Sequence, residues 1–351
     1  MLIGDAGPFE VHDEGTEPMQ AMVLDAPADI ALEPLTLGNL PRPEPGPREI
    51  LLRVSVCGVC RTDLHTVEAD FPLPRTPLVP GHQVVGVVEA VGEEVTERAE
   101  GDRVGGAWLH ETCGRCRFCT AGRENLCPDA RFTGLDADGG YAEFMTAPAA
   151  YTYEVPAGVA DAQAAPLLCA GIIGYRALVR SGIRPGGRLG LYGFGASAHV
   201  AIQVARHWDC RVSVFTRAAE HKALARRLGA EWVGEAGETP PGPLDASVIF
   251  APAGDLVPPA LEAVDPGGTV VLAGIHVSDI PAMTYREHVF HEKTLTSVTA
   301  ATREDGRAMM RLAADVPVET EVQTFPLAEA NRVLRMVKTS AIRGAAVLRV
   351  G

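Results

Sequence analysis

The sequence predicts an α/β protein of two domains, one rich in β-strands and one built on a doubly wound parallel sheet. The chain has 351 residues, and a single hydrophobic core rarely grows beyond about 250–300 residues. Residues 20–155 contain short β-rich runs between Pro and Gly breaks. From about residue 160, apolar strands alternate with amphipathic helices, which is typical of a parallel sheet covered by helices.

The elements can be assigned in chain order from these patterns. In the first region, E-I-L-L-R-V-S-V and Q-V-V-G-V-V-E-A-V read as strands. The stretch 160–180 predicts two helical pieces around Gly171. Further strands are expected at 188–192, 211–215, 247–251, 269–274 and 345–350, and helices at 196–208 and 218–230. Residues 1–19, acidic and broken by Gly and Pro, are expected to form a flexible tail, with a strand added to a sheet edge as the alternative.

Charge and cysteine content narrow the functional class. The formal net charge is −14, which argues against a nucleic-acid or anionic-membrane partner because both require a basic face. The N-terminus lacks the pattern of a signal peptide, and no apolar run has the length of about 18 residues that a membrane span needs. We therefore expect a cytoplasmic protein, in which eight cysteines suggest metal binding or catalysis before disulfides.

One cysteine cluster predicts a structural zinc site. The segment C-G-R-C-R-F-C-T-A-G-R-E-N-L-C places Cys113, Cys116, Cys119 and Cys127 in one short loop. Four thiolates satisfy a closed tetrahedral zinc ion. An iron–sulfur cluster and plain free thiols are the alternatives, but the long gap before the last cysteine favours zinc.

A second ligand set is dispersed along the chain. It consists of Cys60, His82 in P-L-V-P-G-H, and Cys169 in A-P-L-L-C-A-G. Alone, each would read as an ordinary core residue. Together they offer two thiolates and an imidazole, the ligand types of a catalytic zinc whose fourth position is open to water or substrate. Spacing alone does not show that they converge.

A glycine-rich turn predicts a dinucleotide site. G-F-G-A-S-A, with Gly193, Gly195 and Ala198 at the fingerprint positions, follows an expected strand and opens an expected helix. The next strand ends at Thr216-Arg217, where an NAD site usually carries an acidic residue. This pair favours NADP over NAD, with Lys222 or His221 assisting. In the alternative, Arg217 is a solvated surface residue and the cofactor is NAD.

These segments, in this order, resemble those of the zinc-dependent medium-chain alcohol dehydrogenases, and the resemblance covers roughly residues 20–351. It implies a GroES-like catalytic domain at 20–155 and 297–351, and a Rossmann nucleotide-binding domain at 156–296. The resemblance further implies two zinc ions per chain. The catalytic ion would be bound by Cys60, His82 and Cys169, and the structural ion by the four-cysteine loop.

The resemblance assigns roles to other residues. Thr62 would touch the reacting alcohol, and His65 would pass its proton toward solvent. Asp63 would orient a zinc ligand, cap a short helix, or both. Arg303 would lie near the cofactor phosphates, or be an exposed charge at a helix start. The expected lining of the alcohol pocket is Phe71, Trp108 and Leu109, which could equally be core residues.

Gln83 departs from the family pattern, where G-H-E is usual. A neutral amide there removes one negative charge beside the zinc. One hypothesis is therefore a more electrophilic metal, and the other is a neutral variant of a supporting group. An unchanged pH–rate profile in Gln83→Glu would rule out the first.

The expected activity is reversible hydride transfer between a primary alcohol, aliphatic or aromatic, and NAD(P), with zinc polarising the substrate oxygen. The alternatives are another medium-chain reductase, such as a polyol dehydrogenase or a quinone or enoyl reductase, and a catalytically lapsed nucleotide-binding zinc protein. A homodimer or homotetramer is expected.

Overall fold

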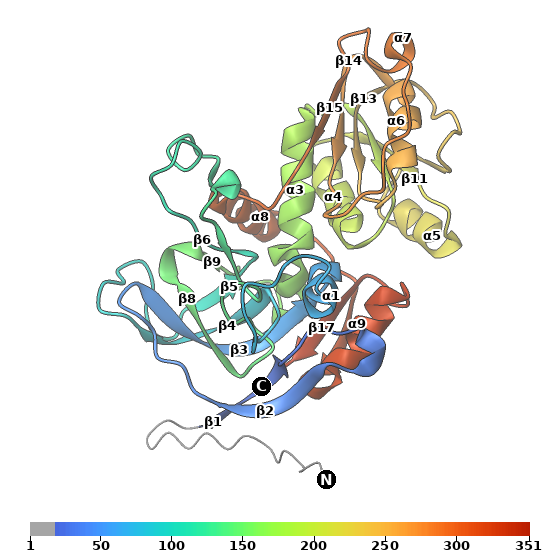
Figure 1. Cartoon of the computed structure of the whole chain (residues 1–351). Coiled ribbons are helices and arrows are strands. Elements are labelled where there is room, and N and C mark those ends of the chain that lie inside the picture. The colour runs from blue at the N-terminus through green and yellow to red at the C-terminus, as the bar shows by residue number, and fades with distance from the viewer. Residues whose placement is uncertain (1–17) are drawn as a thin grey trace.

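The computed structural model describes residues 18–351, which form a β-rich body and a second body of sheet and helices (Figure 1). Most of the expected tail therefore lies outside the described residues. Pro18 and Met19 do not belong to a tail, because they begin β1 (Pro18–Leu24), which pairs antiparallel with β2 (Leu35–Pro41). The expected fold class, a GroES-like domain with a Rossmann domain, is confirmed.

The β-rich body is organised around one mixed sheet. Its strands lie in the order β16-β17-β3-β4-β5-β9, with β8 also paired to β3. Their bounds are β3 (Glu49–Val59), β4 (Gln83–Val91), β5 (Arg103–Gly106), β8 (Phe144–Pro148), β9 (Thr152–Glu154), β16 (Val322–Pro326) and β17 (Ala345–Arg349). The C-terminal strand β17 lies between β16 and β3, so the end of the chain completes the sheet that begins near residue 49.

The second body contains a six-stranded, wholly parallel sheet in the order β12-β11-β10-β13-β14-β15. The strands are β10 (Arg188–Tyr192), β11 (Arg211–Phe215), β12 (Trp232–Gly234), β13 (Leu244–Ile249), β14 (Val264–Leu272) and β15 (Thr294–Ser297). The expected strands at 188–192 and 211–215 are confirmed. The chain order reverses between β10 and β13, and ligands of open α/β sheets bind at such a switch point.

Helices cover this sheet and connect the two bodies. They are α1 (Arg61–Glu68), α2 (Asp161–Ala164), α3 (Ala170–Ser181), α4 (Ala196–His207), α5 (Ala219–Arg227), α6 (Val257–Ala263), α7 (Tyr285–His288), α8 (Arg303–Asp315) and α9 (Ala330–Lys338). Two small strands, β6 (Leu109–Glu111) and β7 (Arg131–Phe132), flank the four-cysteine loop. Helix α8 packs on α3 and on β9, and so bridges both bodies.

The structure corrects one expectation about the middle of the chain. The helical break lies at Cys169 rather than Gly171, because Cys169 has φ −130° and ψ −73° between a 3₁₀ turn (Ala165–Leu168) and α3. That 3₁₀ turn packs on β3, β4 and β5. In addition, β15 ends at Ser297, and it belongs to the parallel sheet. The exact domain boundaries stay predictions.

Among the described residues no single helix is long and apolar enough to cross a membrane; one bent pair, Asp161–Leu168 with Ala170–Ser181, meets the length and composition test only when its halves are taken together.

Candidate active site

The first helix is built around a potential metal ligand. Strand β3 ends at Val59, and Cys60 then serves as the N-cap of α1 in an extended conformation. Its Sγ accepts the Thr62 N–H at 3.4 Å. The Asp63 carboxylate accepts the Cys60 N–H at 2.8 Å, which completes a capping box. The expected N-cap role of Asp63 is thus corrected: Asp63 lies at the third helical position.

Asp63 holds His82 in place through the ring nitrogen opposite the one that faces Cys60. The imidazole is buried, and its Nδ1 lies 2.9 Å from Asp63 Oδ1. The preceding Gly81 has φ +99°, and a Cβ there would overlap the Tyr141 ring, so the tight turn requires glycine. Because Nδ1 is engaged by a carboxylate, Nε2 remains to face Cys60 Sγ at 3.5 Å.

Cys169 completes the cluster from a distant part of the chain. Ligand atoms of Cys60, His82 and Cys169 all lie within 4.8 Å of one another. Without a metal, burial lowers the pKa of His82, but the Asp63 carboxylate and the Cys60 sulfur outweigh burial and raise the pKa to about 10. The hydrogen bond with Cys169 and burial raise the pKa of the Cys60 thiol. The cluster therefore suits a cation, whose binding would displace protons.

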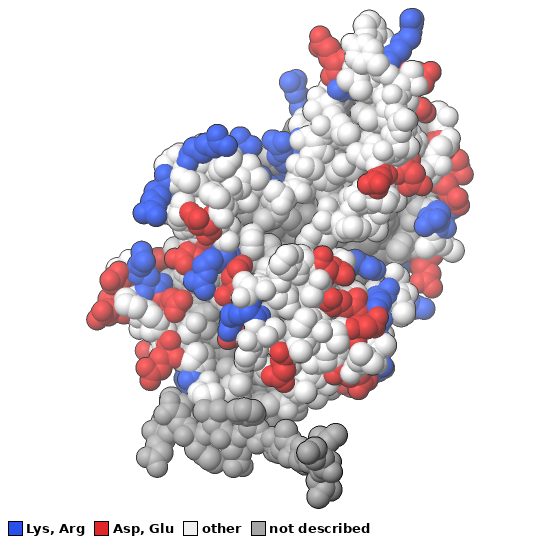
Figure 2. Space-filling view, in the orientation of Figure 1, with Lys and Arg blue, Asp and Glu red and all other residues white. Residues whose placement is uncertain are grey.

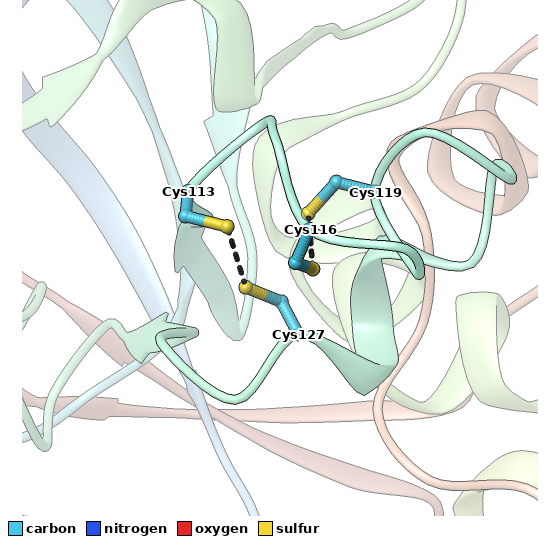
Figure 3. A group of neighbouring side chains, drawn as sticks. All are labelled: Cys113, Cys116, Cys119 and Cys127. Atoms are coloured by element: carbon cyan, nitrogen blue, oxygen red, sulfur yellow. Dashed lines mark hydrogen bonds between the residues drawn. The ribbon is translucent and has the colours of Figure 1, made fainter.

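The four cysteines of the loop also converge (Figure 3). Their sulfur atoms lie within 4.8 Å of one another, with Cys116 and Cys119, and Cys113 and Cys127, each 3.5 Å apart. Backbone hydrogen bonding from Cys119 lowers the pKa of Cys116 to about 7, which favours the thiolate that zinc requires. Several basic side chains gather over the surface of this region (Figure 2).

Arg303 lies beside that loop. As the first residue of α8, it donates to the Glu124 carboxylate through its side chain at 2.7–3.1 Å and through its backbone N–H at 2.8 Å. Its guanidinium also lies 4.4 Å from the Tyr151 ring centroid. Arg303 is therefore not merely an exposed charge. Its expected place near the cofactor phosphates stays a prediction.

Thr62 and His65 occupy one face of α1 near Cys60. Thr62 is 9% exposed. His65 Nδ1 lies 2.5 Å from Asp70 Oδ2, and His65 Nε2 is buried without a hydrogen-bond partner in residues 18–351. The helix ends at Ala69 in a left-handed turn with φ 53°, and this turn brings Asp70 back to His65. Sequence reasoning missed Asp70, although its position just after the helix was the available signal.

Aromatic residues flank the His82 side of the cluster. Trp108 contacts the His82 ring edge-on, with centroids 5.0 Å apart, and stacks on Phe132 at 4.9 Å. Leu109 is 3% exposed and pairs with Phe132 across β6 and β7. Phe71 is half-buried in the turn after α1. Of the three expected pocket residues, Trp108 has a ring contact with a ligand of the cluster, and Phe132, which stacks on Trp108, was missed.

Gln83 begins β4 and is 3% exposed. Its side chain lies against Gly58 of the neighbouring strand, where a Cβ would come 2.9 Å from the Gln83 Cβ. Its Nε2 has no hydrogen-bond partner within the described part of the chain. A buried amide thus follows His82, and its electrostatic effect stays a hypothesis.

The glycine-rich turn has the expected local structure. Gly193 adopts φ +82°, and a Cβ there would lie 2.9 Å from the Ala251 nitrogen. Gly195 caps α4, and a Cβ at Gly195 would meet open space. Ala198 is fully buried. This geometry leaves the start of a twelve-residue helix open to an anionic group.

The end of β11 carries mixed charge. Thr216 is 8% exposed, and Arg217 is exposed. Lys222 is engaged by Glu235 at 2.7 Å, and the pKa of Glu235 is lowered by this hydrogen bond and by Arg217 nearby. Glu235 follows the next strand, β12, and was missed by sequence reasoning. Lys222 is therefore shared with a carboxylate rather than reserved for a phosphate.

Comparison with known proteins agrees with this geometry. Residues 46–157 match the alcohol dehydrogenase GroES-like domain, and residues 196–315 match the zinc-binding dehydrogenase domain. The chain is 50% identical over 340 residues to the probable alcohol dehydrogenase AdhA of Mycobacterium tuberculosis, covering 95% of this chain and 98% of that protein. The chain belongs to the zinc-dependent medium-chain alcohol dehydrogenase family.

Other members of the family show the same relationship. An alcohol dehydrogenase of Geobacillus stearothermophilus is 35% identical over 331 residues, covering 91% of this chain and 97% of its own. The cobalt- and zinc-bound thermostable alcohol dehydrogenase of Pyrobaculum aerophilum superposes with a TM-score of 0.85 at 25% identity, covering 95% of this chain and 100% of its own. The chain is accordingly an oxidoreductase with the alcohol dehydrogenase fold.

Proposed function

We propose that this alcohol dehydrogenase interconverts primary alcohols and aldehydes with a nicotinamide cofactor, using a zinc ion held by Cys60, His82 and Cys169. The observation that carries the proposal is the convergence of these three ligand atoms within 4.8 Å. Two thiolates and one imidazole form a catalytic rather than a closed zinc set, because a tetrahedral ion keeps one position for substrate. When bound, zinc polarises the substrate oxygen.

The residues around the cluster would orient the zinc ligands and shape the space beside the ion. Asp63 accepts from the Cys60 backbone and faces His82 Nδ1, so one carboxylate orients two ligands. Trp108 lies against the His82 ring and would form an apolar wall beside the open position. Such a wall favours the carbon skeleton of an alcohol over bulk water.

Proton movement would run along α1. Thr62 can donate and accept at one oxygen, and His65 lies one helical turn further along. Asp70 would hold a proton on His65 Nδ1 at 2.5 Å, leaving Nε2 free to accept one. That nitrogen is buried and has no hydrogen-bond partner among the described residues. It is therefore able to accept a hydrogen bond from substrate or cofactor.

NADP is the cofactor we favour. Support comes from Arg217 at the end of β11, a position that usually adjoins the adenosine ribose in dinucleotide-binding folds, and from the absence of an acidic residue at the end of that strand. Glu235 pairs with Lys222 and adds negative charge near this position, so it weighs against a strong preference for NADP over NAD. A guanidinium can bind a 2′-phosphate through two parallel hydrogen bonds.

The test is nicotinamide absorbance kinetics on the zinc-replete protein, comparing NADPH with NADH over aliphatic and aromatic aldehydes. We expect turnover with aldehydes and a higher kcat/KM for NADPH, with the preference reduced at least tenfold, about 1.4 kcal/mol, in Arg217→Ala. A preference for NADH would leave the dehydrogenase in place but refute the cofactor choice. No turnover by protein that retains two zinc ions would favour the catalytically lapsed alternative.

Self-association is part of the proposal. Five large apolar residues of one segment are strongly exposed, with exposed fractions of 39–66%: Ile275, Ile280, Tyr285, Val289 and Phe290. The segment connects to β15, the edge strand of the parallel sheet. Exposed apolar patches and open edge strands are typical of interfaces. A second copy of the chain is the partner we propose for this patch, giving a homodimer or homotetramer.

A further inference from the structure

A third cluster of ligand atoms lies in the nucleotide-binding body, apart from both cysteine clusters. Glu262 is on α6, and Glu287 and His288 are on α7. One ligand atom of each lies within 4.8 Å of the others. In Figure 1, α6 and α7 lie at the end of the parallel sheet remote from the β-rich body. Neither the cofactor nor the substrate chemistry proposed above uses these residues.

His288 is the decisive member of the cluster. Its side chain is 6% exposed, and its Nδ1 lies 2.8 Å from the carbonyl oxygen and 3.1 Å from the backbone nitrogen of Thr284. The carbonyl contact is the shorter, so we place the proton on Nδ1, where it is donated to that carbonyl and leaves a lone pair on Nε2. Nε2 makes no hydrogen bond in the described residues, although it faces Glu262 Oε1 at 3.2 Å. In this tautomer two lone-pair atoms lie 3.2 Å apart with no proton between them, an arrangement that a cation bound by both relieves.

The distance itself fits a shared metal ion. Zinc–nitrogen and zinc–oxygen bonds are about 2.0–2.2 Å, so two ligands at a tetrahedral angle lie about 3.3–3.5 Å apart. The observed separation of 3.2 Å is close to that value. The oxygen also lies off the direction of an Nε2–H bond, as the missing hydrogen bond shows. Two ligands of one ion each point at the ion and therefore not directly at each other. In a direct hydrogen bond the N–H would point at the oxygen.

The charge around the cluster also favours a bound cation. Within residues 18–351, Glu287 forms no ion pair, and Glu262 pairs only with His288. The nearby Lys293 ammonium is directed to the carbonyl oxygen of Leu261 at 2.6 Å. Two carboxylates therefore adjoin one imidazole without a fixed cation between them. Like charges at such distances are unfavourable unless a counter-charge binds.

We propose that Glu262, Glu287 and His288 bind a divalent transition-metal ion, with zinc as the best match, and that this ion fastens α7 to α6. One imidazole and two carboxylates suit zinc, cobalt or nickel, whereas magnesium and calcium prefer all-oxygen sets. Water would fill the remaining position. The bound ion would fix the start of the segment that carries Tyr285, Val289 and Phe290.

The experiment counts metal on the full-length protein whose cysteine clusters are already loaded. Zinc-replete protein is freed of excess metal by gel filtration and titrated calorimetrically with Zn²⁺. We expect wild type to bind one further equivalent and to gain thermal stability from it. Glu262→Gln and Glu287→Gln replace exposed residues and should fold normally. Each should weaken binding of the further zinc equivalent at least tenfold. Glu292→Gln, an exposed neighbour outside the cluster, is the matched control.

Cobalt separates this site from the cysteine clusters. Cobalt bound by thiolates gives intense sulfur-to-metal charge-transfer absorption, whereas cobalt bound by oxygen and nitrogen does not. The added equivalent should therefore bind without that absorption. The proposal is overturned if wild type takes up no further ion, or if Glu262→Gln takes it up as tightly as wild type. Either result would leave the His288–Glu262 contact as a simple ion pair, with Nε2 carrying the proton.

Discussion

Asp63 is a single carboxylate with two functions in the structure. One oxygen accepts from the Cys60 backbone and the other faces His82 Nδ1. In Asp63→Asn the amide keeps the size but loses the charge that favours the metal-binding tautomer of His82. Loss of such a supporting group typically weakens metal binding about 10–100-fold. We expect chelator-driven release of one of two zinc ions to accelerate by that factor, as measured with a zinc indicator.

The matched control is Asp315→Asn at the exposed end of α8, which should release zinc as wild type does. The second ion, in the four-cysteine loop, serves as an internal control because Asp63 does not contact it. Equal acceleration of both ions would indicate general destabilisation, and would contradict a specific effect on His82.

Asp70 should matter for turnover more than for binding. Asp70→Ala removes the partner of His65 Nδ1, so the ring can adopt the other tautomer or rotate. General acid–base groups contribute about 10²–10⁴-fold, and we expect loss of this positioning to lower kcat about tenfold, with little change in KM. Asp70→Asn, which can still accept a hydrogen bond, should recover part of the rate. An unchanged kcat in Asp70→Ala would remove Asp70 from the proton path.

The sequence predicted the zinc ligands and one of their partners, Asp63, but not the residues that support the rest of the site. Cys60 and His82 could be predicted because metal ligands have few residue types and recognisable settings. Phe132 and Glu235 could not, because each acts through a neighbouring strand whose geometry no periodicity encodes. For Asp70 the one signal was its position just after the helix. The roles of Cys60, His82 and Cys169 as ligands of one ion were predicted by resemblance, because spacing along the chain does not encode their convergence.

The ion pair between Glu124 and Arg303 joins the four-cysteine loop to helix α8. Burial tends to raise the pKa of Glu124, but Arg303 outweighs it and holds the pKa below its usual range. A lowered folded-state pKa means that the pair stabilises the fold fully above the unfolded value of about 4.3. The contribution is lost as pH falls through the folded-state pKa.

Glu124→Gln should therefore lower the free energy of unfolding by about 1–3 kcal/mol at neutral pH, measured by denaturant titration of zinc-loaded protein. The difference from wild type should shrink as the pH approaches about 4 and below. The exposed pair Glu111–Arg131 provides the control, since Glu111→Gln should change stability by less than about 1 kcal/mol. A difference that grows in acid would contradict the assigned sign.

At the level of elements, regular strands and helices were easier to predict than their interruptions. Strands β10 and β11 matched the sequence pattern because alternation of apolar strands and amphipathic helices is local. The break at Cys169 was misplaced at Gly171, because tertiary contacts of the preceding 3₁₀ turn, rather than glycine, decide where the helix begins. The short strand β12 was missed because three residues carry too little pattern.

At the scale of the whole molecule, the apolar patch near α7 should determine how many chains associate in the oligomer. Phe290→Ser replaces a side chain that is 55% exposed in the single chain. If the patch is an interface, its loss should shift the protein toward monomer, as measured by light scattering coupled to size exclusion. Leu32→Ser, at a residue that is 75% exposed in the β-rich body, should leave the mass unchanged. An unaltered mass for Phe290→Ser would place the interface elsewhere.

The position of β17 between β16 and β3 has a consequence for how the protein is made. Strand β17 follows the nucleotide-binding body in the chain, so it is synthesised after that body. Domains generally fold as units during synthesis. The nucleotide-binding body can thus fold before β17 emerges, whereas the β-rich body can close its sheet only once β17 has been made. A nascent chain that stalls just before residue 345 should therefore expose the edge of β3 to chaperones.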